Sequence, residues 1–121
     1  MNPLVVGAQV LALLTSTADV RAVATDGDVT WVGTTGGLVR VEAGRSRRFT
    51  PRDGLPDGTV RALLAEEGGT LWVGTDRGVV RCATRDGFAV TRRIAPARRV
   101  EAIARHRGTL FVGTTDGLWS L

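Results

Sequence analysis

Apolar and polar residues alternate in short runs along this chain, and the runs recur in a fixed order. The segment VTWVGTTGGLVR at residues 29–40 returns as TLWVGTDRGVVR at 70–81 and as TLFVGTTDGLWS at 109–120. Alternation at every second residue, β-branched side chains and glycine-containing turns are typical of short antiparallel strands. The pattern therefore predicts an all-β protein.

The repeat has a constant length. Val-Arg-Ala at residues 20–22 returns at 60–62 and as Val-Glu-Ala at 100–102, so the period is 60 − 20 = 100 − 60 = 40 residues. Each full unit contains four predicted strands separated by turns. Four antiparallel strands in a unit of roughly 40 residues are typical of a β-propeller blade.

The units divide residues 1–121, interpreted as a single propeller segment, into consecutive blades. We predict blade 1 at 20–57, blade 2 at 60–97 and a blade 3 of only three strands at 100–121. Residues 8–20 align without a gap with 88–100, so that Val10 falls on Val90. The run at 8–16 is therefore interpreted as the fourth strand that blade 3 lacks. A signal peptide is the alternative, although the run lacks a basic start, and it is too short to span a membrane.

Three blades cannot close a ring, because single-ring propellers typically contain four to eight blades. They leave two apolar flanks and an unpaired strand edge, which are features of interfaces. Two copies would make six blades, whereas three copies would exceed the usual range. We therefore predict a homodimer that closes a six-bladed ring with two-fold symmetry. The alternative is a piece of a longer propeller.

Composition supports a folded protein, with 43% hydrophobic and 23% charged residues. The net charge is +4 and every basic side chain except His106 is arginine. Two arginine pairs, at 47–48 and 92–93, fall on fourth strands, where charge protects an exposed edge; a third pair is at 98–99. Clustered arginine can also bind phosphates, but the edge interpretation is preferred, so nucleic acid is not an expected partner.

The turns between the second and third strands of each unit are the candidate ligand contacts. With the linkers that precede each first strand, they should line one mouth of the ring. The residues concerned are Thr35, Asp76, Arg77, Thr115 and Asp116. Polar turns without any ligand are the simpler interpretation of the same residues.

Two repeated positions of the second strand are interpreted as structural. Aromatic residues at the first could stack on sugars or bases, but packing inside a blade fits a repeated strand position better. Glycine at the second would let another backbone approach closely. These residues are Trp31, Trp72 and Phe111, and then Gly33, Gly74 and Gly113. Trp119 is expected at the seam between chains, and Thr34, Thr75 and Thr114 are expected to hydrogen-bond within their turns.

No arrangement typical of catalysis or of a metal or cofactor site is found. His106 is unique, is placed in a turn and is expected to be solvated, and Cys82 is expected to pack unreactively. Asp53 and Asp57 fit turn chemistry. A hydrolase or lyase would need a polar cluster from the first strands, which offer chiefly Arg21, Arg61 and Glu101, so a non-enzymatic protein without cofactors is predicted.

The segment FTPRDGLPDGTVRALLAEEGGTLWVGTDRGVVR, residues 49–81, resembles the propeller repeat in sensor regions of two-component regulators. The first and third units match it from Val-Arg-Ala or Val-Glu-Ala through Val-Gly-Thr. The resemblance implies an extracytoplasmic sensor region joined to a histidine kinase. It favours a binding or scaffold module for a small-molecule or glycan ligand, with a purely structural fragment of a larger sensor as the alternative.

Overall fold

The computed structural model describes residues 19–94 and 98–121, which form strands and one short helix. Sheet 1 contains β1 (Val20–Asp26), β2 (Val29–Thr34), β3 (Gly37–Glu42) and β4 (Arg45–Phe49), and the 3₁₀ helix η1 (Pro51–Asp53) follows it. Sheet 2 contains β5 (Val60–Glu66), β6 (Thr70–Thr75), β7 (Gly78–Ala83) and β8 (Ala89–Ile94). Sheet 3 contains β9 (Val100–His106), β10 (Thr109–Thr114) and β11 (Gly117–Ser120). The predicted strand at 8–16 lies outside the described residues.

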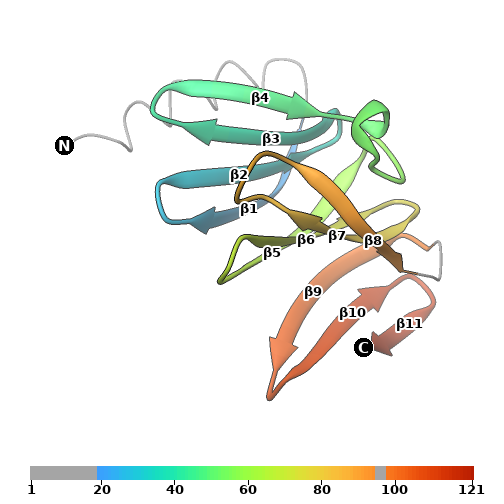
Figure 1. The fold of residues 1–121 in the computed structure, drawn as a ribbon. Coiled ribbons are helices and arrows are strands. Elements are labelled where there is room, and N and C mark those ends of the chain that lie inside the picture. Colours follow the sequence, from blue (N-terminus) through green and yellow to red (C-terminus); the bar gives the residue numbers. More distant parts are fainter. Residues whose placement is uncertain (1–18, 95–97) are drawn as a thin grey trace.

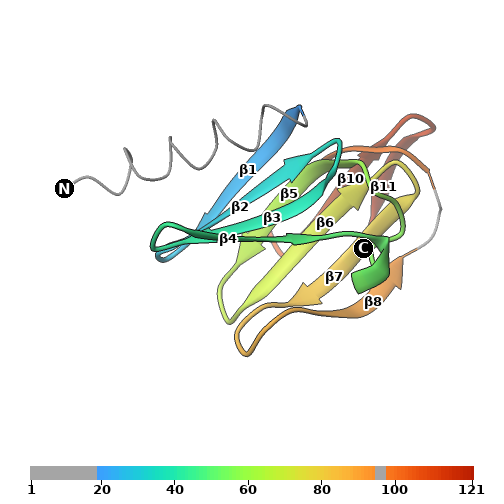
Figure 2. The ribbon, with the colours of Figure 1, turned by 90° about the horizontal axis from the view of Figure 1, so that it is seen from above.

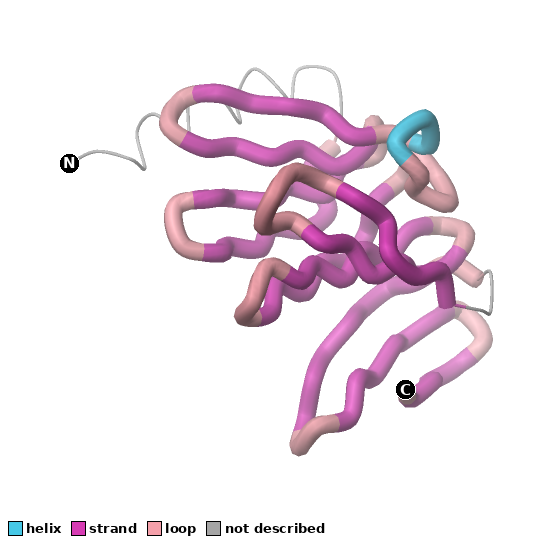
Figure 3. The backbone as a smooth tube through the Cα atoms, in the orientation of Figure 1, coloured by secondary structure: helices cyan, strands magenta, loops and turns pink. Residues whose placement is uncertain are grey.

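Each sheet is an antiparallel meander in which strands pair in chain order. The sheets follow one another as blades, from sheet 1 (blue to green) to sheet 3 (red) (Figure 1). The first strands, β1, β5 and β9, are neighbours across the sheets, and the view from above shows the sheets side by side (Figure 2). Almost all of the described chain is strand and tight turn (Figure 3). The predicted all-β architecture with propeller-type blades is therefore confirmed.

A threonine closes the turn between the second and third strands of every sheet. In sheet 2, Thr75 Oγ1 donates to the carbonyl of Gly78 at 2.9 Å and accepts from the backbone N–H of Arg77 at 3.1 Å. Thr34 and Thr114 make the same contacts in their own turns. Gly78 has a φ of +114°, which favours glycine at this position. The expected threonine hydrogen bonds are thus confirmed.

The linker between sheets 1 and 2 is held by local side-chain hydrogen bonds. Thr50 caps η1, and the Asp53 carboxylate accepts from the Thr50 N–H at 2.9 Å, which makes a capping box. Asp57 accepts from the Thr59 N–H at 2.9 Å. Both aspartates therefore perform the turn chemistry that the sequence predicted.

The core lies between the sheets as well as within them. Between sheets 1 and 2, Phe49 stacks on Phe88 with ring centroids 4.2 Å apart, and Trp31 lies 6.1 Å from Phe49. Cys82 belongs to the same cluster and is fully buried. The packed position expected for Cys82 is thus confirmed, and burial raises the pKa of its thiol to about 12.

Candidate functional site

One end of the sheets, called the mouth here, combines the turns after β2, β6 and β10 with the residues just before β1, β5 and β9. A backbone hydrogen bond joins turn and linker at the same position of each sheet. The bonds run from Thr35 N to Asp19 O (3.0 Å), from Asp76 N to Thr59 O (3.3 Å) and from Thr115 N to Arg99 O (3.2 Å). The structure therefore brings the predicted turns and linkers together at one end of the molecule.

A β-bulge recurs at the mouth in the first strand of every sheet. Val60 pairs with Thr75 and Ala62 with Gly74, so Arg61 between them has no partner in the ladder. Corresponding register shifts leave Arg21 in β1 and Glu101 in β9 unpaired. Bulges re-aim side chains, and here each one presents a charged residue beside the mouth.

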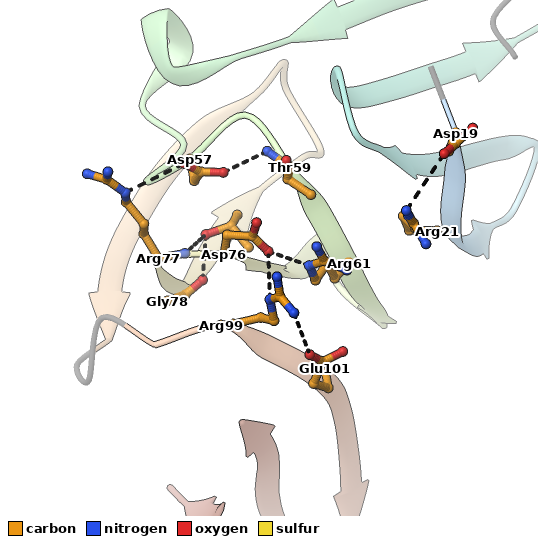
Figure 4. A network of polar contacts seen from close by, with 11 residues as sticks. Asp19, Arg21, Asp57, Thr59, Arg61, Asp76, Arg77, Gly78, Arg99 and Glu101 are labelled. Atoms are coloured by element: carbon orange, nitrogen blue, oxygen red, sulfur yellow. Dashed lines mark hydrogen bonds and ion pairs between the residues drawn. The ribbon is translucent and has the colours of Figure 1, made fainter. Parts of the chain in front are cut away.

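Asp76 is the centre of a polar network that joins sheets 2 and 3 (Figure 4). Its Oδ1 forms an ion pair with Arg61 and lies 3.6 Å from Arg99 Nε. Arg99 also lies 3.9 Å from Glu101. The hydrogen bond to Asp76 raises the pKa of Arg61 above its usual value. Asp76, a candidate ligand contact, is thus already held by two guanidinium groups from neighbouring sheets.

The other charged groups of the mouth are paired in the same way. Arg77 Nε lies 3.7 Å from Asp57 Oδ1, and Arg98 forms an ion pair with Asp116. The side chains of Arg77, Arg98 and Asp116 are at least half exposed, and exposed ion pairs hold their partners weakly, at about 0.2–1 kcal/mol. An incoming ligand could replace these partners at low cost.

The charged side chains of the mouth are paired with one another. The Asp76 carboxylate is engaged by the guanidinium groups of Arg61 and Arg99. Within residues 19–94 and 98–121, no group of three or more histidine, cysteine or acidic side chains could hold a metal ion. Thr35 and Thr115 are exposed turn residues. The arrangement supports reversible polar contacts, and the ligand role of the predicted residues stays a prediction.

The repeated aromatic and glycine positions lie in the blades and not in the mouth. Trp31 and Trp72 are buried, at 1% and 6% exposure, and Phe111 is half-buried. Trp119 is 45% exposed on β11, the last strand of sheet 3.

The arginine pairs and His106 complete the predicted positions. The pairs at 47–48 and 92–93 lie on β4 and β8, the outer strands of their sheets, as the edge interpretation requires. His106 is exposed but is the last residue of β9 and not part of a turn. The predicted turn began one residue too early, because the antiparallel pairing of β9 and β10 extends to His106 and Thr109.

A second polar cluster, at the other end of β5, was not predicted. Glu66 accepts a hydrogen bond from Trp72 Nε1 at 2.8 Å and from Arg105 Nη2 of sheet 3 at 2.9 Å. The hydrogen bonds from Arg105 and Trp72 lower the pKa of the Glu66 carboxyl below its ordinary value of 4.5. Sequence reasoning missed this pair because its partners are 39 residues apart and meet only when two sheets pack together.

The Glu66 cluster predicts a pH-dependent contribution to stability. Because the folded pKa lies below 4.5, the stabilisation is complete above the unfolded pKa and is lost as the pH falls through the folded pKa. Glu66→Gln should therefore lower the urea midpoint near neutral pH and make no difference at about pH 2. Urea unfolding followed by tryptophan fluorescence at both pH values tests this. Glu67→Gln, in the adjacent exposed turn, is the control, and an equal effect of both substitutions would contradict the assignment.

Comparison with known proteins places this geometry in context. The family described as two component regulator propeller matches residues 54–77. No curated protein matches the chain. The described residues include no helix that is long and apolar enough to cross a membrane.

Two solved structures from B. thetaiotaomicron are similar in fold. The extracellular domain of the hybrid two component system BT3049 has a TM-score of 0.71 at 21% identity, over 86% of this chain and 16% of its own. The extracellular domain of the one component system BT4673 has a TM-score of 0.69 at 24% identity, over 87% of this chain and 14% of its own. The chain thus spans about one sixth of the first structure and about one seventh of the second. The resemblance inferred from the sequence is confirmed: the family model of the two component regulator propeller matches residues 54–77, and the chain is similar in fold to these extracellular domains.

Proposed function

We propose that the chain is a non-enzymatic β-propeller module that closes a six-bladed ring with a second copy and binds a small-molecule or glycan ligand across the mouth. The observation that carries the ring is the exposure of apolar residues on sheet 3. Leu118 and Trp119 are 70% and 45% exposed, whereas their counterparts in sheet 2, Val79 and Val80, are 3% and 0% exposed. Apolar exposure of this kind marks an interaction surface.

The ring is tested by the mass of the chain in solution. Light scattering on a size-exclusion column, over a dilution series, should give two chain masses at high concentration and one at low concentration, because association follows mass action. A single chain mass at every concentration would contradict the ring.

The ligand part of the proposal is supported by the balanced charges of the mouth. Each of its arginines has a carboxylate partner, which gives no excess positive charge for nucleic acid. A thermal-shift screen of sugars and small metabolites against the ring tests it. A true ligand should lose its stabilising effect in the double variant Arg77→Ala and Asp116→Ala but keep it in Arg85→Ala, an exposed turn outside the mouth.

A structural unit of a larger sensor, without a ligand of its own, is the second candidate. It is favoured by the extent of the similarity, because the chain covers only 16% and 14% of the extracellular domains that it resembles. This function predicts a chain that stays monomeric and shows no stabilisation by any compound in the same screen.

A further inference from the structure

The contact between neighbouring blades contains a repeated valine-on-glycine pair. A Cβ atom placed on Gly33 of β2 would lie 2.7 Å from Val60 Cγ1 of sheet 2, and one placed on Gly74 of β6 would lie 2.5 Å from Val100 Cγ1 of sheet 3. At both seams the first valine of the following sheet therefore packs directly on a glycine of the second strand. A side chain at that glycine would overlap the valine.

At each flank of the described chain, one member of this valine-on-glycine pair lacks its partner. Gly113 is the counterpart of Gly33 and Gly74, yet the nearest atom of the described residues to a Cβ there is Ala102 Cβ of its own sheet, at 3.8 Å. Val20 is the counterpart of Val60 and Val100, which are 0% and 1% exposed, but Val20 is 37% exposed. The two unmatched halves complement each other, and they can meet between two copies.

The charges of the bulged residues fit the same contact. At the seam between sheets 2 and 3, Arg61 and Glu101 are the unpaired bulge residues of β5 and β9, two strands that pack against each other. A second copy that follows sheet 3 would place its Arg21 at the corresponding position beside Glu101. Opposite charges would then meet at the new seam, which favours this order of blades.

An apolar hollow lies at the seam between sheets 2 and 3. It is lined by Val79, Ile94, Val100, Val112, Trp119 and Leu121, with Thr114. By strand register, the apolar lining residues are the counterparts of members of the core cluster between sheets 1 and 2. In that cluster, Phe88 and Val90 add apolar side chains from the fourth-strand segment of sheet 2. The described part of sheet 3 has no fourth strand to supply such side chains. The sequence aligns Ala8 and Val10 with Phe88 and Val90.

We propose that a second copy of this chain docks head to tail on sheet 3, with its Val20 seated on Gly113, its Arg21 beside Glu101 and its residues 8–16 paired along β11. The inference rests on the proposed ring and names the contact that closes it. Both seams of the ring are then identical, as two-fold symmetry requires. The seam also has a direction, because Gly113 and Val20 lie on different flanks.

The decisive variant is Gly113→Ala, because a Cβ at this position meets nothing closer than 3.8 Å among residues 19–94 and 98–121 of its own chain. The variant should keep the circular dichroism spectrum of the wild type. Its dimer should dissociate about 100-fold more readily in the dilution series, since each of the two seams acquires an overlap. Val10→Asp should also weaken the dimer, because a carboxylate would enter the apolar hollow. Gly58→Ala, whose Cβ would make only an ordinary contact, is the control.

A mixing experiment tests the direction of the seam. Val20→Ala removes the Cγ atoms that would overlap the new methyl group, so the Gly113→Ala and Val20→Ala chains should form a mixed dimer with one native seam and one relieved seam. This mixed dimer should be tighter than the Gly113→Ala dimer. If Gly113→Ala leaves the affinity of the wild-type dimer unchanged, the proposed seam is overturned while the ring stands. If Val10→Asp forms a dimer of wild-type affinity, residues 8–16 do not belong to the seam. A monomeric wild type would overturn the ring and the seam together.

Discussion

Phe49→Ala should lower the free energy of unfolding by about 3–5 kcal/mol, the usual range for removing a buried aromatic side chain. Phe49 is the last residue of β4 and is 2% exposed. Its ring stacks at 4.2 Å on Phe88, which directly precedes β8 of the neighbouring sheet, and lies 6.1 Å from Trp31. Truncation would therefore open a cavity at the seam between sheets 1 and 2, where both sheets lose packing.

Urea unfolding monitored by tryptophan fluorescence measures this loss at a fixed chain concentration. Phe49→Leu is the matched control, because it keeps most of the apolar volume and should cost less than about 1.5 kcal/mol. A loss of less than about 1 kcal/mol for Phe49→Ala would mean that the sheets do not depend on this aromatic contact. The effect is expected to be global, because the contact joins two blades.

The strands of this fold are predictable from sequence because the necessary information is local. Alternating runs such as VRALLAE, residues 60–66, are observed as complete strands, and threonine and glycine mark the turns between them. The constant repeat also fixes the order of strands within each sheet. Even the meeting of the predicted turns and linkers at one end follows from this order, because antiparallel neighbours return the chain to the same edge.

The contacts between blades are not predictable in the same way. The Asp76 network depends on a bulge that re-aims Arg61 and on the approach of Arg99 from the next sheet. The Glu66 and Arg105 pair likewise depends on how two sheets pack. Repeat alignment gives the position of such residues within a blade, but not the stagger between blades. The 40-residue repeat places Arg61 and Glu101 at equivalent positions of their blades. That they are neighbours follows only once β5 is known to pack against β9.

Gly74→Val should destabilise the chain by about 3 kcal/mol or more, at the upper end of overpacking effects. A Cβ atom alone at Gly74 would lie 2.5 Å from Val100 Cγ1, 2.9 Å from Val100 Cβ and 3.2 Å from Ala62 Cβ. These neighbours are buried and belong to two different strands, so they cannot move aside without separating sheets 2 and 3. Gly58→Ala, which meets no such neighbour, should change the stability by less than about 0.5 kcal/mol.

A double-mutant cycle identifies the contact that causes this loss. Gly74→Ala should cost about 1–3 kcal/mol by overpacking, and Val100→Ala should also destabilise by removing buried methyl groups. Together they should cost less than the sum by about 1 kcal/mol or more, because the shorter side chain at position 100 makes room for the new methyl group. Additive losses would show that Val100 is not what restricts position 74. A compensating pair would establish, within one chain, the valine-on-glycine packing that the proposed seam between two copies repeats.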